Sequence, residues 1–260
     1  MYVVFARKYR PQTFEDVVGQ QHVARTLQNA VRNERVAHAY LFCGSRGVGK
    51  TTMARILAKA LNCKEGPTPD PCGECDSCRR IATGDDVDVL EIDGASNNSV
   101  DEVRELRKNV RLAPAHSRFK IYYIDEVHML SNSAFNALLK TLEEPPSHVK
   151  FIFSTTDPQK MPETVKSRCQ RFDFRRISDR DIVECLAGIC EKEGLDVPEE
   201  GLAAIARSAR GGMRDALGAL DQLAAYGDEH ELDDVLQVLG AVDGRLLGQV
   251  VDCLAKEDVA

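Results

Sequence analysis

The segment at 44–51, GSRGVGKT, constrains the fold of this chain more than any other feature of its sequence. It fits the phosphate-binding pattern G-x-x-x-x-G-K-[ST], in which glycines allow backbone N–H groups to surround phosphate oxygens. Such a loop must follow a strand and open a helix, because the phosphates bind at the helix N-terminus. The apolar run 39–43 and the helical pattern 52–61 provide both elements. We therefore expect a nucleotide site here; the alternative is a glycine-rich turn without a ligand.

The residue types of the loop predict their roles. Lys50 is expected to neutralise the β- and γ-phosphates, and the Thr51 hydroxyl to ligate Mg²⁺. The residues expected to contact the nucleotide are Gly44, Ser45, Arg46, Gly47, Val48, Gly49, Lys50, Thr51 and Thr52. Downstream, the apolar segment YYIDE ends in Asp125 and Glu126. Asp125 suits the metal and Glu126 suits polarising the attacking water, although two solvated loop acids are the alternative.

Short apolar runs alternate with helical patterns over the first half of the chain. The runs predicted as strands are 39–43, 87–92, 120–125, 150–155 and 170–174. Strands separated by helices form βαβ units, so we expect an α/β core over 1–177, with a parallel five-stranded sheet covered on both faces. Only helical periodicity follows, which predicts a small all-helical domain over 178–242. Residues 243–260 are expected to begin a further, truncated domain.

Four of the nine cysteines lie close together, in the segment CKEGPTPDPCGECDSC. Four thiolates without a nearby histidine suit tetrahedral Zn²⁺ with no open position for water, so we expect a structural module over 62–80. The expected zinc ligands are Cys63, Cys72, Cys75 and Cys78. A bacterial ferredoxin run would need a further cysteine where the chain has Ala82. An iron–sulfur cluster and four free thiols are the alternatives.

Composition and charge limit where the chain can be located and how it can contact nucleic acid. The N-terminal segment lacks an apolar signal-peptide core, and no apolar run approaches about 18 residues, so we expect a cytoplasmic protein without a membrane span. The net charge of −7 gives no overall attraction to nucleic acid, and a DNA contact would need a local basic face. A helix predicted between the second and third strands carries Arg104, Arg107, Lys108 and Arg111. These residues form either a solvated surface or such a face.

Further segments complete a recognisable order of motifs. They are RKYRPQTFEDVVGQ before the phosphate loop, and IDEVHML, STTDPQK, SRCQRF and GGMRDAL after it. Together with the loop and the cysteine module, this order closely resembles the clamp-loader ATPase family of bacterial DNA polymerase III (tau/gamma) over nearly the whole chain. The resemblance implies an AAA+ fold, in which an α/β nucleotide domain is followed by a helical lid and then by a collar domain.

The resemblance also assigns roles outside the phosphate loop. Thr155 or Thr156 resembles the sensor of the γ-phosphate, and Arg214 resembles a second sensor in the lid. Arg168 resembles an arginine finger that reaches the ATP of a neighbouring subunit. The residues that resemble the lining of an adenine pocket are Arg10, Pro11, Val17, Val18 and Gly19. Without the family, the arginines would be interpreted as surface ion-pair partners and the threonines as strand-end caps.

The family implies an ATP-driven motor. ATP bound at subunit interfaces would drive opening of a sliding clamp and gripping of primed DNA, and hydrolysis would release them. The implied partners are the delta and delta prime subunits, further tau/gamma copies, the sliding clamp and primed DNA. An arginine finger from a neighbour is worth about 10³–10⁵ in rate, so the isolated chain is expected to bind ATP but to hydrolyse it slowly. We also expect the chain to be a monomer. The alternatives are another AAA+ DNA motor, such as a Holliday-junction branch-migration or replication-initiation ATPase, and a non-catalytic scaffold.

Overall fold

The computed structural model describes residues 2–97, 105–106, 108–227, 230–240 and 253 of the chain. The chain divides into two compact units, one of Pro11–Arg176 and one that combines Met1–Arg10 with Ile177–Ala260. We call them the α/β unit and the helical unit. In the described parts of both units, every helix is too short or too polar to cross a membrane.

Five strands of the α/β unit form one parallel sheet. They are β1 (Ala39–Cys43), β2 (Val89–Asp93), β3 (Lys120–Asp125), β4 (Val149–Thr155) and β5 (Gln170–Asp173). Their order across the sheet is β2-β3-β4-β1-β5, and all neighbouring pairs are parallel. The predicted α/β class and the parallel five-stranded sheet are therefore confirmed.

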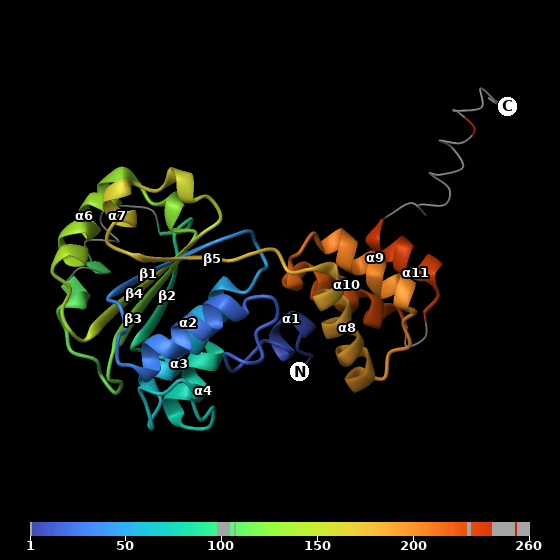
Figure 1. The fold of residues 1–260 in the computed structure, drawn as a ribbon, viewed down its shortest axis with the longest axis horizontal. Coiled ribbons are helices and arrows are strands. Elements are labelled where there is room, and N and C mark those ends of the chain that lie inside the picture. The colour runs from blue at the N-terminus through green and yellow to red at the C-terminus, as the bar shows by residue number, and fades with distance from the viewer. Residues whose placement is uncertain (1, 98–104, 107, 228–229, 241–252, 254–260) are drawn as a thin grey trace. The chain divides into compact units, whose positions relative to one another are not determined.

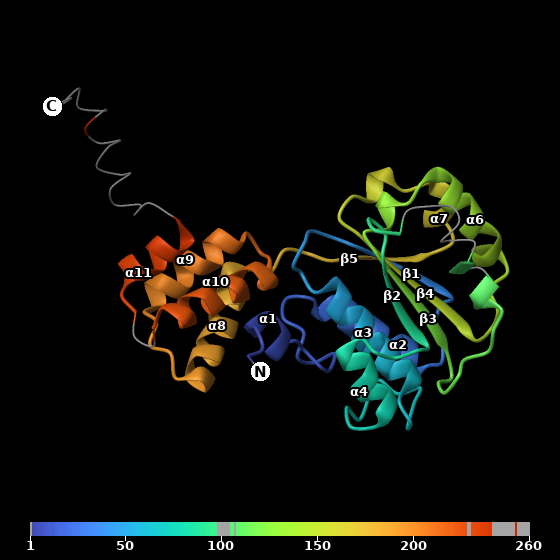
Figure 2. The ribbon, with the colours of Figure 1, turned by 180° about the vertical axis from the view of Figure 1, so that it is seen from behind.

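Helices cover both faces of this sheet, as Figures 1 and 2 show. They are α2 (Gln21–Arg32), α3 (Lys50–Asn62), α4 (Asp76–Thr83), α6 (Asn132–Glu143) and α7 (Glu163–Lys166), with the short 3₁₀ helices η1 (Val127–Met129) and η2 (Pro158–Lys160). Successive strand residues face opposite sides. Tyr40 and Phe42 of β1 accordingly join the apolar cluster of α2 and α3, whereas Leu41 joins that of α6 and α7.

The carboxyl ends of the strands meet at one edge of the sheet. Cys43 lies opposite both Thr155 and Asp173, and Asp93 lies opposite Asp125. Open parallel sheets bind ligands outside this edge. The phosphate loop that follows β1 and the acidic pair at the end of β3 therefore lie at the same edge of the sheet.

The basic helix predicted between β2 and β3 lies only partly within the described residues. Arg104 and Arg107 fall outside them. Lys108 and Arg111 are exposed, while Val110 is buried in the apolar cluster on the α6 side. The described part thus has one buried side and one basic, exposed side.

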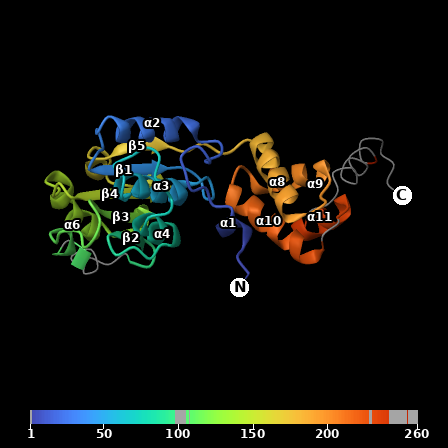
Figure 3. The same ribbon diagram turned by 90° about the horizontal axis from the view of Figure 1, so that it is seen from below.

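Figure 3 shows the helices from which the helical unit is built. They are α1 (Phe5–Lys8), α8 (Asp179–Glu193), α9 (Glu199–Ala209), α10 (Met213–Tyr226) and α11 (Leu232–Leu239). Leu186, Ile205 and Leu220 are fully buried, so the apolar sides of α8, α9 and α10 face the interior of the unit. The predicted further domain over 243–260 lies outside the described residues, apart from the single position 253.

Residues 1–10 differ from the prediction, which assigned them to the α/β core. They belong to the helical unit, where α1 packs against α10 and Phe5 is buried. The backbone N–H of Phe5 donates to Asp221 Oδ1 at 2.9 Å, and the side chains of Lys8 and Tyr9 both donate to Glu193. These partners lie 184 to 216 positions away in the sequence, so no local pattern reveals the assignment.

Candidate nucleotide site and cysteine cluster

The phosphate loop connects β1 to α3 in a conformation that depends on glycine. A Cβ atom at Gly44 would lie 2.7 Å from the carbonyl oxygen of Phe174, closer than side chains tolerate. Gly49, the last residue before α3, has a φ of 101°, which glycine adopts without steric strain. The first turn of α3 has N–H groups without intrahelical partners and opens into this loop, as a phosphate site requires. The other loop positions are Val48, which is buried, Arg46, which is exposed, and Ser45, Gly47 and Thr52, which are partly exposed.

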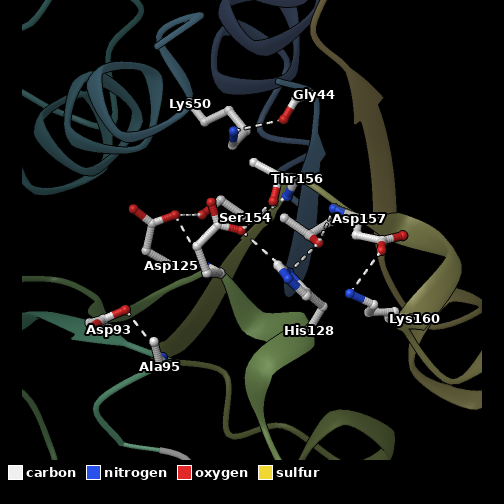
Figure 4. A network of polar contacts seen from close by, with 12 residues as sticks. Gly44, Lys50, Asp93, Ala95, Asp125, His128, Ser154, Thr156, Asp157 and Lys160 are labelled. Atoms are coloured by element: carbon white, nitrogen blue, oxygen red, sulfur yellow. Dashed lines mark hydrogen bonds and ion pairs between the residues drawn. The ribbon is translucent and has the colours of Figure 1, made fainter. Parts of the chain in front are cut away.

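Lys50, the first residue of α3, is only 6% exposed. Its Nζ donates to the carbonyl oxygen of Gly44 at 2.8 Å (Figure 4). It also donates to the carbonyl oxygen of Ser45 at 2.8 Å. Burial lowers the pKa of Lys50, and the charges of Glu126 and Asp125 oppose this effect. Neutral carbonyl groups therefore hold the ammonium inside the loop. A charged phosphate oxygen would be a stronger acceptor for it than these carbonyl oxygens.

A chain of hydroxyl groups connects the start of α3 with the end of β3. Thr51 Oγ1 lies 3.0 Å from Tyr123 OH, which in turn lies 3.0 Å from Ser154 Oγ. Ser154 Oγ donates to Asp125 Oδ1 (Figure 4). Burial raises the pKa of Tyr123, with a further increase from the charge of Asp125, so its hydroxyl keeps its proton. The structure thus links Thr51 and Asp125, the two predicted Mg²⁺ ligands, through a continuous polar chain.

Sequence analysis did not identify Tyr123 or Ser154. Tyr123 lies two residues before Asp125 on β3, and alternation along the strand places both on the same face. That pattern could have indicated Tyr123. Ser154 is different, because it reaches Asp125 only through the register between β3 and β4, in which Ile124 pairs with Phe153. The sequence does not reveal this register.

Glu126 follows β3 directly and has a φ of 44°, an uncommon value for a residue with a side chain. Its Oε2 accepts hydrogen bonds from the N–H and Oγ1 of Thr156, at 3.1 and 2.9 Å, and lies 3.3 Å from His128 Nδ1. The same His128 nitrogen lies 3.0 Å from Thr155 Oγ1 (Figure 4). Both candidate sensor threonines at the end of β4 therefore belong to the polar network around Glu126. His128 is a member of this network that the sequence analysis missed.

Gln20, which directly follows the predicted adenine-pocket residues Val17, Val18 and Gly19, is anchored beside the phosphate loop. Gln20 donates from Nε2 to the Arg175 carbonyl at 2.6 Å and accepts from the Arg175 N–H at 3.1 Å. Arg175 follows Phe174, the residue against which Gly44 packs. Of the predicted lining residues, Val17 is buried, and those partly exposed are Arg10, Pro11, Val18 and Gly19. Arg10 belongs to the helical unit, and the other four belong to the α/β unit.

The two arginines singled out by the resemblance lie in different units. The Arg168 guanidinium donates to the carbonyl oxygen of Thr164 at 2.6 Å and to Glu143 Oε1 at 2.7 Å. These contacts hold Arg168 beside α6 and α7. Arg214 is exposed at the second position of α10.

The four clustered cysteines converge just beyond the C-terminal end of α3. Their sulfur atoms lie within 4.8 Å of one another, and the Cys63 and Cys72 sulfurs are 3.5 Å apart. Sulfurs bound to one tetrahedral Zn²⁺ at about 2.3 Å would lie roughly 3.8 Å apart. Burial raises the pKa of Cys75, but hydrogen bonds from the backbone of Lys64 and Cys78 lower it to about 7. The cluster therefore fits a metal ion held by four thiolates.

Two family models match the chain. One is described as DNA polymerase III, delta subunit, and matches residues 19–178; the other, DNA polymerase III clamp loader subunit, ATPase lid domain, matches residues 181–229. The DNA polymerase III subunit gamma of Buchnera aphidicola (subsp. Acyrthosiphon pisum) is 46% identical over 258 residues, which cover 99% of this chain and 72% of that protein. The chain belongs to the DNA polymerase III tau/gamma family. The family indicated by its motifs is thereby confirmed.

Other members of the tau/gamma family are longer than this chain. The DNA polymerase III subunit tau of Bacillus subtilis (strain 168) is 52% identical over 260 residues, which are 100% of this chain and 46% of that protein. The subunit tau of Escherichia coli (strain K12) is 53% identical over 243 residues, which are 93% of this chain and 38% of that protein. The chain thus spans less than half the length of these two relatives.

Solved structures with little sequence similarity share the fold. The Thermotoga maritima RuvB Holliday junction branch migration motor has a TM-score of 0.67 and 17% identity, covering 89% of this chain and 72% of that one. At this identity the likeness concerns the fold alone. Together with the match of residues 181–229 to the ATPase lid domain, it supports the predicted AAA+ architecture.

Proposed function

We propose that this tau/gamma-family chain is the ATP-hydrolysing motor subunit of a clamp loader, which opens a sliding clamp and loads it onto primed DNA within the DNA polymerase III holoenzyme. The observation that carries the proposal is the polar chain from Thr51 to Asp125 beside the buried Lys50, because it joins phosphate and metal ligands in one site. Its partners would be the delta and delta prime subunits, further tau/gamma copies, the clamp and primed DNA in the cytoplasm.

In this proposal the loop 44–52 binds the phosphates of ATP. Lys50 would exchange its carbonyl acceptors for phosphate oxygens, and the segment that includes Val17, Val18 and Gly19 would receive the adenine, with Arg10 and Pro11 beside it. Mg²⁺, when bound, would neutralise charge on the phosphates. The Thr51 hydroxyl and the Asp125 carboxylate would hold it.

Glu126 would act as the base of the hydrolytic step. Its carboxylate would take a proton from water as the water oxygen bonds to the γ-phosphorus and the bond from that phosphorus to the bridging oxygen breaks, leaving ADP and phosphate. The two hydrogen bonds from Thr156 orient this carboxylate. Thr155 or Thr156 would sense the γ-phosphate, Arg214 would sense it from the helical unit, and Arg168 would stabilise the transition state in a neighbouring subunit.

We also propose that Cys63, Cys72, Cys75 and Cys78 bind one structural Zn²⁺. The mutual distances of their sulfurs support it. Elemental analysis of the purified protein should find zinc in equimolar amount. Iron would instead indicate an iron–sulfur cluster, and the absence of both metals would leave four free thiols.

ATP turnover by the full-length protein with its candidate partner subunits tests the proposed function. Turnover should rise strongly only when clamp and primed DNA are both present. Arg168→Ala should keep ATP binding and lose this stimulation, by about 10³-fold or more, and Glu126→Gln should bind ATP without hydrolysing it. Turnover indifferent to the clamp would favour another AAA+ DNA motor, and a chain that does not bind ATP would favour a scaffold.

A further inference from the structure

Lys59 is a buried cation in the middle of the α/β unit. It lies on α3 and is only 2% exposed. An ammonium group is expensive to bury unless hydrogen bonds satisfy it, so its acceptors reveal which part of the molecule it holds. Lys59 Nζ donates to the backbone carbonyl of Gln12 at 2.5 Å and to Gln12 Oε1 at 2.9 Å. Both acceptors belong to Gln12, which directly follows Arg10 and Pro11 of the predicted adenine pocket.

The segment around Gln12 is folded on itself and against the core. Asp16 Oδ2 accepts from the N–H and the hydroxyl of Thr13, at 3.0 and 2.7 Å. Phe14 and Val17 are buried in the same apolar cluster as residues of α3. The segment 11–20 is therefore attached at three places, which are Gln12 at α3, the two apolar side chains in the core, and Gln20 at the end of β5.

Helix α3 connects this segment to the phosphate loop. The helix begins with Lys50, and Lys59 lies nine positions later, a separation of about 13–14 Å along the axis. A nucleotide has its phosphates at one end and its base at the other, so one rigid helix would set the spacing between the two binding regions. Pro11 next to the first anchor, and Val18 and Gly19 between the last two, stay partly exposed and offer apolar surface and backbone groups to a purine.

We propose that Lys59 is a positioning residue that fixes the segment 11–20 relative to the phosphate loop and thereby sets the affinity for the adenine base. The proposal rests on the proposed nucleotide function. Lys59 does not touch the ligand; it acts through Gln12. The phosphate loop has its own hydrogen bonds, so its affinity for a triphosphate is independent of Lys59.

Calorimetric titration of the full-length protein with Mg²⁺ and either ATP or inorganic triphosphate separates the contribution of the adenine base from that of the phosphates. Lys59→Met should weaken ATP binding about tenfold, because an untethered segment must be ordered on binding, and should leave triphosphate binding unchanged. Lys150→Met is the matched control. Lys150 is a partly buried lysine of β4 whose ammonium lies over the ring of Phe119, a residue outside the segment 11–20, and its replacement should change neither affinity.

A second pair of variants covers the case in which Lys59→Met does not fold. Gln12 is exposed, so Gln12→Leu should fold. It removes the Oε1 acceptor and keeps the backbone acceptor of Lys59, and should therefore weaken ATP binding less than Lys59→Met does, while Gln12→Glu keeps both acceptors and should preserve it. Equal losses for ATP and triphosphate, or no loss in the folded variants, would overturn the proposal. Wild-type protein that binds neither probe would contradict the proposed function, and equal affinity of the wild type for both would exclude a base site.

Discussion

The two ends of helix α3 organise their loops by different physical means. At the N-terminal end, the phosphate loop is shaped by glycine conformations and by the bonds from Lys50 to two loop carbonyls. At the C-terminal end, the segment 64–77 buries only Gly66 and Pro71, and the sulfurs of the four clustered cysteines gather within 4.8 Å of one another. The difference indicates that the backbone of one loop already has the shape for its proposed ligand, whereas we expect the other, which buries little apolar surface, to need the proposed metal to hold its shape.

The largest effect should come from removing the metal. Replacing Cys72 and Cys75 by serine should abolish zinc binding, which supplies an apparent energy of about 10–16 kcal/mol to a site of this kind. Limited proteolysis should then cut within 64–77, while ATP affinity changes little, because the phosphate loop does not depend on the cluster. Cys185→Ser in α8 is the control. If the segment resists protease without zinc, its order does not depend on the metal, and the two ends of α3 do not differ in the way described.

The next largest effect should come from Lys50→Met. Loss of the buried ammonium should weaken ATP binding by about 100-fold or more, or roughly 3 kcal/mol, because the phosphates lose a charged donor. Zinc content and thermal stability should stay close to those of the wild type. Calorimetry for ATP and a melting curve test both statements. An unchanged ATP affinity would mean that the loop works through its backbone alone.

Gly44→Ala should have an intermediate effect, on folding stability. The new methyl group would approach the Phe174 carbonyl to 2.7 Å, so we expect the free energy of unfolding to fall by about 1–3 kcal/mol. Gly188→Ala in α8 meets no atom within 4 Å and should instead raise the stability of its helix by about 0.5–1 kcal/mol. Urea unfolding measures both variants. Equal changes would show that close packing against Phe174 does not constrain the loop.

The smallest effect should come from Ser154→Ala. This change breaks the polar chain and leaves the buried Tyr123 hydroxyl with one partner fewer, at a cost of about 1 kcal/mol in folding stability. The Mg²⁺ concentration needed for half-maximal turnover should also rise, because Asp125 loses an orienting donor. Ser133→Ala, on the exposed start of α6, is the control and should change neither quantity. An unaltered Mg²⁺ dependence would mean that Ser154 does not contribute to metal binding.

Much of the site could be predicted because its chemistry is local in sequence. Lys50 and Thr51 stand in one short motif, and Asp125 and Glu126 end one apolar strand. The contacts that hold the neighbouring segments in place could not be predicted in this way. Gln12 meets Lys59, and Gln20 meets Arg175, only because separate elements pack together, and polar residues at such positions look like ordinary surface residues in the sequence.

The sequence by itself determined the strands, the phosphate loop, the acidic pair and the set of four cysteines. Each can be recognised from the spacing of nearby residues, because strand alternation, helical periodicity and ligand motifs each extend over only a few positions. The tertiary structure alone decided that residues 1–10 join the helical unit, that Ser154 completes the chain to Asp125, and that Lys59 holds Gln12. These contacts join segments far apart in the chain, and their free energy depends on burial and register that exist only once the elements have packed.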